Sequence, residues 1–231
     1  MQNIIENENL KEKLFNEIKS FKENKTIISH PYDLAKDLEK LRDENEHEYK
    51  YICKKMPSEL FAEVLCEMPS YVQEEITEII SEKKVANITS KMDSDDASAL
   101  IQNISHKDEE YAEHILERLD DEDKQIIEKL NSYSENECGH FMQSEFFKVY
   151  EDESIEEAII RLKELKKTNI LDNIFHAHIV NKEEKFIGSL GFEELILYKH
   201  SQKFSEISKE KLTHYVINDK ADIDDAVEMF S

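Results

Sequence analysis

The chain has 231 residues, enough for two small domains that each bury a hydrophobic core. It carries 53 acidic and 30 basic residues, a net charge of −23, while 39% of its residues are hydrophobic. The hydrophobic share excludes a disordered acidic tail. The charge opposes binding to nucleic acid or to anionic lipids and favours a cation or a basic surface as partner.

The chain is predicted to be helical from its start to about residue 132. Residues 1–29 are interpreted as an N-terminal helical extension, because Leu10, Leu14 and Phe21 recur at helical spacing. A second helix is predicted to begin at His30-Pro31-Tyr32, where the proline fits the first turn.

A short motif then marks several helix starts. Met56-Pro57-Ser58 recurs as Met68-Pro69-Ser70 and again as Met92-Asp93-Ser94, each followed by apolar residues at helical spacing. The serine of each triplet is predicted to be the N-cap of its helix, because a serine hydroxyl can accept a hydrogen bond from the first turn.

Two further helices are expected, one opening at Ser105 and one at Asp120 or Asp121. A short helix with one apolar stripe cannot bury that stripe alone, so neighbouring helices must stack against one another. The pattern predicts a superhelix of short helices.

The use of glycine and proline changes across the segment 133–142. All three prolines precede it, and Gly139, Gly188 and Gly191 lie within it or after it. We interpret this segment as a hinge between two domains.

The second half alternates strands and helices. Strands are predicted at 146–150, 177–180 and 186–190, with a short helix at 192–196. Between the first two strands, Ser154-Ile155-Glu156-Glu157 has the S-x-x-E pattern of a capping box and predicts a helix start.

This order then restarts. A strand is predicted at 214–217, and a helix that begins near Asp222 continues to Ser231. We therefore expect one complete β-α-β-β-α unit and the opening of a second, as in a piece of a longer protein.

Two observations bear on the compartment. The three cysteines are widely spaced without a C-x-x-C pair, which favours reduced thiols. No apolar run approaches ~18 residues, so we expect that this chain does not itself cross a membrane.

Together these features resemble the cytoplasmic region of the MgtE family of magnesium transporters, and the resemblance covers residues 30–231. The second half alone resembles a CBS domain followed by the opening of another. The supporting motifs are His30-Pro31-Tyr32-Asp33-Leu34-Ala35, Met92-Asp93-Ser94-Asp95-Asp96-Ala97, the joint from Tyr133 through Cys138-Gly139 to Phe141-Met142, Glu153-Ser154-Ile155-Glu156-Glu157-Ala158, and Phe186-Ile187-Gly188-Ser189-Leu190-Gly191-Phe192-Glu193-Glu194-Leu195.

The resemblance implies a mostly α-helical chain of defined parts. A right-handed superhelix, the MgtE N domain, would occupy residues 30–132, and the hinge would occupy 133–142. An α/β CBS region would follow at 143–231, with its first unit ending near residue 203 and its second truncated.

The resemblance also implies a regulatory region rather than an enzyme. Such a region would sense Mg²⁺ on the cytoplasmic side of the bacterial inner membrane. It would form a homodimer and close a pore in the transporter's own transmembrane domain, which this chain lacks. No nucleic acid is expected as partner.

Five aspartates are the candidate metal ligands: Asp95 and Asp96 in the helical half, and Asp222, Asp224 and Asp225 in the second half. Mg²⁺ keeps several waters and is usually held by one or two carboxylates, so a sensor needs facing acidic surfaces rather than a dense motif. The alternative is structural, because carboxylates in the first turn of a helix cap backbone N–H groups and complement its dipole.

Two other functions stay open. CBS domains suggest adenine nucleotide such as ATP as a cofactor, but Gly191 and Glu194 stand where those domains tend to have a hydroxyl residue and an aspartate. The absence of that hydroxyl counts against an ATP site. A helical scaffold that senses nothing is the third reading, because Ala99 replaces the last carboxylate of the family's repeat motif.

Overall fold

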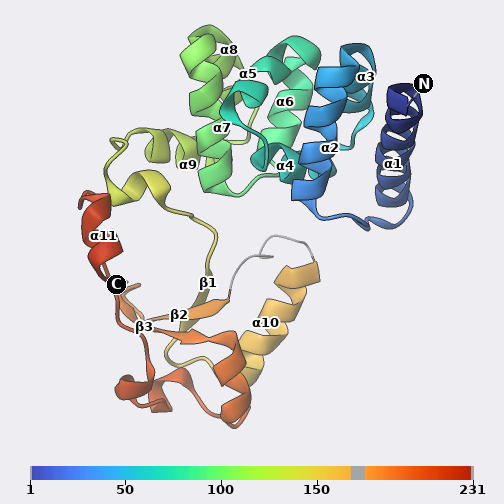
Figure 1. Cartoon of the computed structure of the whole chain (residues 1–231). Helices are drawn as coiled ribbons and strands as arrows, with labels where there is room; N and C mark the ends of the chain where they lie inside the picture. The colour runs from blue at the N-terminus through green and yellow to red at the C-terminus, as the bar shows by residue number, and fades with distance from the viewer. Residues whose placement is uncertain (1, 168–174, 230–231) are drawn as a thin grey trace. The chain divides into compact units, whose positions relative to one another are not determined.

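The computed structural model describes residues 2–167 and 175–229 (Figure 1). The chain divides into two compact units, Met1–Ser134 and Glu135–Ser231, so the division falls within the segment 133–142. Within the described ranges, no helix combines the length and the apolar character needed to cross a bilayer.

The first unit is helical throughout its described part, as predicted. Its core is a continuous cluster of buried apolar side chains drawn from successive helices. Its helices are α1 (Gln2–Asn24), α2 (Pro31–Glu44), α3 (Glu46–Lys55), α4 (Ser58–Cys66), α5 (Ser70–Ile79), α6 (Glu82–Thr89), α7 (Ser94–Lys107), α8 (Glu109–Leu116) and α9 (Asp121–Asn131).

Helix α1 packs as part of this core rather than standing apart from it. Leu14, Ile18 and Phe21 are buried in the same cluster as the later helices. The buried carboxylate of Glu17 accepts a hydrogen bond of 3.0 Å from the backbone N–H of Ile28. This bond ties the connection after α1 back onto the helix.

The repeated triplets begin helices, but their serines are not the N-caps that the sequence predicts. Pro57, Pro69 and Asp93 occupy the N-cap positions in extended conformations, and each serine is the first helical residue. The fixed φ of proline suits the extended backbone at the N-cap, so the helix begins one residue earlier than predicted.

The predicted helix start at Ser105 is also wrong. Helix α7 continues through Ser105 to Lys107, and Asp108 caps α8 by accepting a 3.0 Å hydrogen bond from the N–H of Tyr111. The predicted start at Asp120 is confirmed, because its carboxylate accepts a 2.9 Å bond from the N–H of Asp123.

The second unit contains a three-stranded sheet in its described part, with strand order β1-β2-β3. Strands β1 and β2 pair in parallel with Val149 opposite Ile179, and β2 pairs antiparallel with β3. Its elements are η1 (Cys138–Phe141), β1 (Phe147–Tyr150), α10 (Ile155–Lys167), β2 (His176–Val180), β3 (Phe186–Gly191), η2 (Phe192–Leu197), η3 (Phe204–Glu206), η4 (Lys209–Lys211) and α11 (Ile223–Met229).

The predicted capping box of α10 is confirmed. The N–H of Ser154 donates a 2.8 Å hydrogen bond to Glu157, and the N–H of Glu157 donates a 3.3 Å bond to the hydroxyl of Ser154. Helix α10 then buries Ile155 and Ala158 against the inner face of the sheet.

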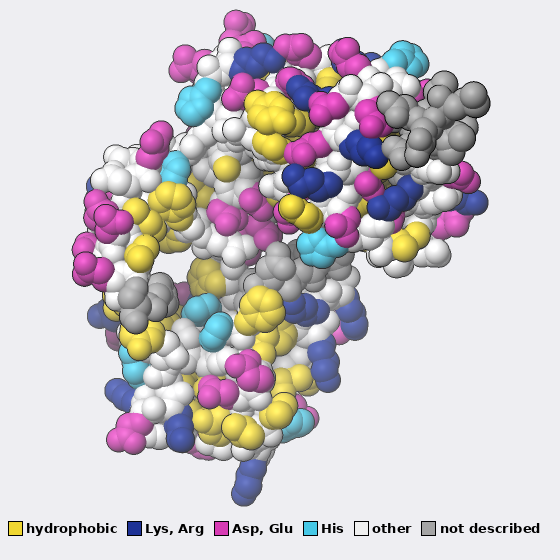
Figure 2. All heavy atoms as spheres, viewed as in Figure 1, with side chains coloured by type: hydrophobic (Ala, Val, Ile, Leu, Met, Phe, Trp, Pro, Cys, Tyr) yellow, Lys and Arg dark blue, Asp and Glu magenta, His cyan; other side chains and the backbone are white. Residues whose placement is uncertain are grey.

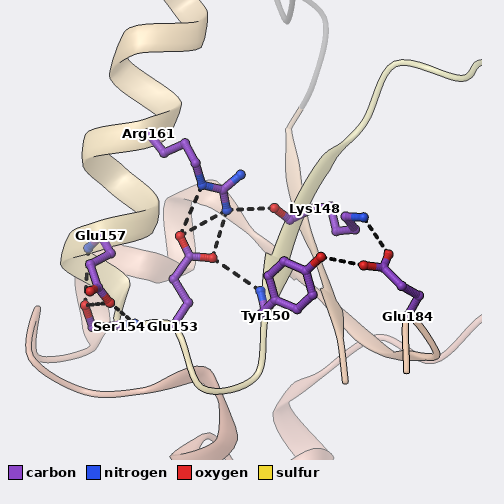
Figure 3. Close-up of polar contacts among 7 residues, drawn as sticks. All are labelled: Lys148, Tyr150, Glu153, Ser154, Glu157, Arg161 and Glu184. Atoms are coloured by element: carbon purple, nitrogen blue, oxygen red, sulfur yellow. Dashed lines mark hydrogen bonds and ion pairs between the residues drawn. The ribbon is translucent and has the colours of Figure 1, made fainter. Parts of the chain in front are cut away.

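A polar network fastens α10 to strand β1 (Figure 3). The Arg161 guanidinium donates hydrogen bonds to the Glu153 carboxylate and, at 2.8 Å, to the carbonyl of Lys148. On the other side of the strand, the Glu184 carboxylate accepts from both Lys148 and Tyr150. The network fixes the turn between β1 and α10.

Two predicted elements differ from the structure. The segment predicted as a helix at 192–196 is the 3₁₀ helix η2, and the predicted strand at 214–217 is irregular. Among the described residues, the only bridge to the sheet near this segment is the one between Ser189 and Thr213, the residue just before it. A strand needs a hydrogen-bonded neighbour along its length, and here Tyr215 and Val216 are about two-thirds exposed. The predicted extension of the last helix to Ser231 lies outside the described residues.

Candidate cation-binding residues

Asp95 and Asp96 lie together in the first turn of α7, as the sequence predicts. One oxygen of Asp95, Oδ1, is buried and has no hydrogen-bond partner. An unpaired carboxylate oxygen is costly to bury, so this atom is available to a donor or a cation.

Asp96 lies at the centre of a group of acidic side chains. Its neighbours raise its pKa, mainly by partial burial of the carboxyl group and further through the charges of Asp95 and Glu67, while a hydrogen bond from Cys66 acts in the opposite direction. Burial likewise raises the pKa of the Cys66 thiol, and the charges of Asp96, Asp93 and Asp95 add to that effect.

We define Glu67, Asp93, Asp95 and Asp96 as the α7 acidic cluster. Like charges held this close repel one another, and the repulsion is relieved by a bound cation. Glu67 and Asp93 are not among the residues that the sequence selects. Asp93 could have been found from its place in the repeated triplet, whereas no local signal places Glu67 beside it.

Ala99 lies one helical turn after Asp95 on the same helix and is exposed. Residues four apart share a helix face, so a carboxylate at this position would extend the cluster. The α7 acidic cluster therefore lacks the last carboxylate of the repeat motif, because Ala99 stands at that position.

The other three candidates gather at the start of α11. Asp222 caps the helix, because its Oδ1 accepts a 3.0 Å hydrogen bond from the N–H of Asp224, and its Oδ2 accepts from the side chain of Asn136 at 3.2 Å. Asp224 and Asp225 are exposed in the first turn. The capping alternative thus applies to Asp222, whereas the other two carboxylates face water.

The described residues contain no set of three or more His, Cys, Asp or Glu side chains arranged to enclose a metal ion. This excludes a site in which the protein supplies most ligands, as for zinc. A hydrated Mg²⁺ held by one or two carboxylates requires fewer protein ligands than that.

Gly191, at the position that bears on nucleotide binding, has room for a larger side chain only if the neighbouring Glu193 side chain moves. A Cβ atom added to Gly191 would lie 2.7 Å from the carboxylate of Glu193. Gly191 ends strand β3, and Glu194 is exposed in the 3₁₀ helix that follows.

The acidic surplus is distributed rather than concentrated. On the face in Figure 2, acidic side chains are interspersed with Lys and Arg over the helical unit. The surface as a whole attracts cations, but particular clusters must provide any selectivity.

The fold and these carboxylates define a class of protein: an acidic helical repeat domain followed by an α/β unit with a three-stranded sheet. Residues 29–136 match the family described as the MgtE intracellular N domain. The chain is 25% identical over 186 residues to the magnesium transporter MgtE of Thermus thermophilus, an alignment that covers 80% of this chain and 40% of that protein. These matches agree with the resemblance seen in the sequence, and the chain is similar to the magnesium transporter MgtE.

Solved structures agree with this placement at the level of fold. One, described as the cytosolic domain of the Mg²⁺ channel MgtE in complex with ATP, has a TM-score of 0.73 and 23% identity, covering 88% of this chain and 79% of that one. Another, described as the soluble part of a magnesium transporter, has a TM-score of 0.77 and 17% identity, covering 97% and 86%. This chain spans less than half the length of the Thermus thermophilus protein.

Proposed function

We propose that this chain is the Mg²⁺-sensing regulatory region of a magnesium channel or transporter. The observation that carries the proposal is the α7 acidic cluster, where burial and the charges of Asp95 and Glu67 raise the pKa of Asp96 and where one oxygen of Asp95 has no hydrogen-bond partner. A cation bound there removes a repulsion that the protein otherwise tolerates. The kinship to MgtE supplies the identity of the cation and the regulatory role.

The mechanism follows from differential binding. A cation shifts an equilibrium between arrangements only if one arrangement binds it more tightly. We propose that Mg²⁺ favours closure of the acidic domains. Without Mg²⁺, each like-charged pair at contact opposes closure by ~1 kcal/mol in a water-like dielectric. The chain acts as a regulator in this proposal and not as a catalyst.

The test compares the whole chain with and without millimolar MgCl₂ at matched ionic strength. We expect Mg²⁺ to reduce the radius of gyration in X-ray scattering and to protect the segment 133–142 from protease. The double variant Asp95→Asn/Asp96→Asn should weaken both responses. The matched control Asp121→Asn/Glu122→Gln, in the first turn of α9, should leave them intact. Identical scattering and digestion with and without Mg²⁺ would show that the chain does not sense the ion.

An adenine nucleotide is the second candidate ligand, because one structure of similar fold is described as an ATP complex. Calorimetry with ATP and AMP in the absence of Mg²⁺ distinguishes the two functions. Tight nucleotide binding together with an unchanged scattering response to Mg²⁺ would favour the nucleotide function. Absence of both responses would favour a helical scaffold.

A further inference from the structure

A polar cleft of about 630 Å³ opens in the helical unit among α2, α3, α5 and the end of α7. It lies outside the α7 acidic cluster, since it shares no residue with it. Three basic side chains and five carboxylates line the cleft, so its wall carries a surplus of negative charge. The carboxylates are those of Asp43, Glu44, Glu46, Glu75 and Glu78.

Tyr49 contributes a buried and unsatisfied polar group to this cleft. Its side chain is 1% exposed, and its hydroxyl has no hydrogen-bond partner. The Cys53 thiol lies close by without forming a hydrogen bond of normal geometry, and the Arg42–Glu75 ion pair on the cleft wall acts electrostatically on the same hydroxyl. A buried hydroxyl without a partner is unfavourable, so a ligand that supplies a hydrogen bond is favoured there.

The basic side chains of the cleft are already engaged by carboxylates, which disfavours an anionic ligand. A bare metal ion is disfavoured too, because the described residues offer no metal-enclosing set of side chains. The engaged pairs are Arg42 with Glu75 at 2.5 Å, Lys50 with Glu46 at 2.5 Å, and Lys107 with Glu78 at 2.6 Å.

We propose that this cleft binds a small linear organic polycation of the diamine or triamine class. Ammonium groups only donate hydrogen bonds, and carboxylate and hydroxyl oxygens accept them. Five carboxylates against three basic groups leave two negative charges in excess, which meet the charge of the ligand, while Ile79 contributes apolar surface for its methylene chain. The volume suits a ligand of this size. The site is independent of Mg²⁺ sensing, so either proposal can fail without the other.

The experiment titrates the whole chain with spermidine in a calorimeter at fixed ionic strength. The double variant Glu44→Gln/Glu78→Gln removes two charges from the cleft, whereas Glu109→Gln/Glu110→Gln removes two exposed charges from α8. We expect the cleft variant to weaken spermidine binding about tenfold, and the α8 variant less than about twofold, because charge attraction falls with distance and with screening. Equal weakening in both variants would mean that spermidine binds only through the general negative charge of the chain, and this result would overturn the proposal.

Tyr49→Phe provides a second test that leaves the charge unchanged. The substitution keeps the ring and removes a hydroxyl that forms no hydrogen bond in the protein, so the variant should fold with undiminished stability. We expect spermidine binding to weaken about tenfold, as for the loss of one hydrogen bond to a charged group. Unchanged affinity in this variant, or no measurable binding by the parent chain, would contradict the proposed site.

Discussion

The ammonium group of Lys84, on α6, donates a hydrogen bond of 2.8 Å to the carbonyl of Cys53 near the C-terminal end of α3. The same group reaches the carbonyls of Lys54 and Met56 at 2.9 and 2.8 Å. The last carbonyls of a helix have no partner within it. Lys84 therefore caps α3 from a different helix and joins two repeats of the superhelix.

Replacing Lys84 by methionine should destabilise the helical unit. The variant keeps most of the side-chain length but leaves three carbonyls without their donor, at a cost of about 1–3 kcal/mol. Chemical denaturation followed by circular dichroism measures this loss. The neighbouring Lys83→Met, at an exposed position, is the control and should change the stability little. Equal stability of the two variants would mean that water replaces the ammonium without penalty.

Replacing Asp96 by asparagine should stabilise the helical unit in the absence of divalent cations. The folded state raises the pKa of Asp96, so the ionised carboxylate weakens the folded state at neutral pH. The gain should be about 0.5 kcal/mol at neutral pH, because one side of the residue is exposed and solvent screens it. It should vanish as the pH falls below the ordinary carboxyl pKa of 3.8, where folded and unfolded chains are both protonated.

Asp121→Asn provides the control for this prediction. Asp121 is also an aspartate in the first turn of a helix, as the first residue of α9. Its replacement should give no gain, because asparagine loses the favourable interaction with the helix dipole. A loss of stability in Asp96→Asn at neutral pH would show that the cluster is not strained by its own charge.

Replacing Gly188 by alanine should destabilise the second unit by about 1–3 kcal/mol, the usual cost of overpacking. The added Cβ would lie 2.8 Å from the Cβ of Leu212 and 3.0 Å from the ring of His214, so the segment after η4 must move. Gly191→Ala is the matched control, because the three atoms nearest its added Cβ belong to the end of the flexible Glu193 side chain, which can move at little cost. Thermal unfolding measures the stability of both variants. A larger loss in Gly188→Ala than in Gly191→Ala is expected, and equal losses would show that close packing at Gly188 is not the cause.

The second unit should lose stability as the pH falls through the range where histidine titrates. Burial lowers the pKa of His178 below its ordinary value of 6.5, with a smaller effect from the charge of His176. The unfolded chain then binds the proton more tightly than the folded chain, so acid favours unfolding by up to about 1 kcal/mol.

Hydrogen exchange of residues 176–191 measures this pH dependence, after correction for the intrinsic exchange rate. In the folded chain, His178 Nδ1 lies 2.9 Å from the hydroxyl of Ser189. His178→Asn keeps a group that can pair with this hydroxyl but does not titrate, so its pH dependence should be flatter. An identical slope in parent and variant would exclude His178 as the cause.

Local sequence patterns predicted much of this fold. The capping box at Ser154 and Glu157 and a helix start at Asp120 or Asp121 were both predicted from a few adjacent residues, and Asp120 is the N-cap. The helix starts at the repeated triplets were displaced by one residue, because the N-cap depends on backbone geometry that serine and proline satisfy differently. The strand predicted at 214–217 failed for a related reason, since a strand depends on a neighbour and not only on its own residues.

The candidate site likewise combines residues that the sequence could select with neighbours that only the structure reveals. The repeat motif selected Asp95 and Asp96, but it could not indicate that Cys66 and Glu67, almost thirty residues earlier, lie beside them. Whether the five candidate aspartates bind metal stays a prediction.

The sequence by itself determined the acidic charge, the helical first half, the capping signals and the kinship to MgtE, because these depend on composition and on residues close together in the chain. Only the tertiary structure decided that the Lys84 ammonium caps α3, that Asp96 is crowded by like charges, and that Tyr49 keeps a buried hydroxyl without a partner. Hydrogen bonding, desolvation and charge repulsion act over a few ångströms in space, and a linear sequence does not state which distant residues come that close.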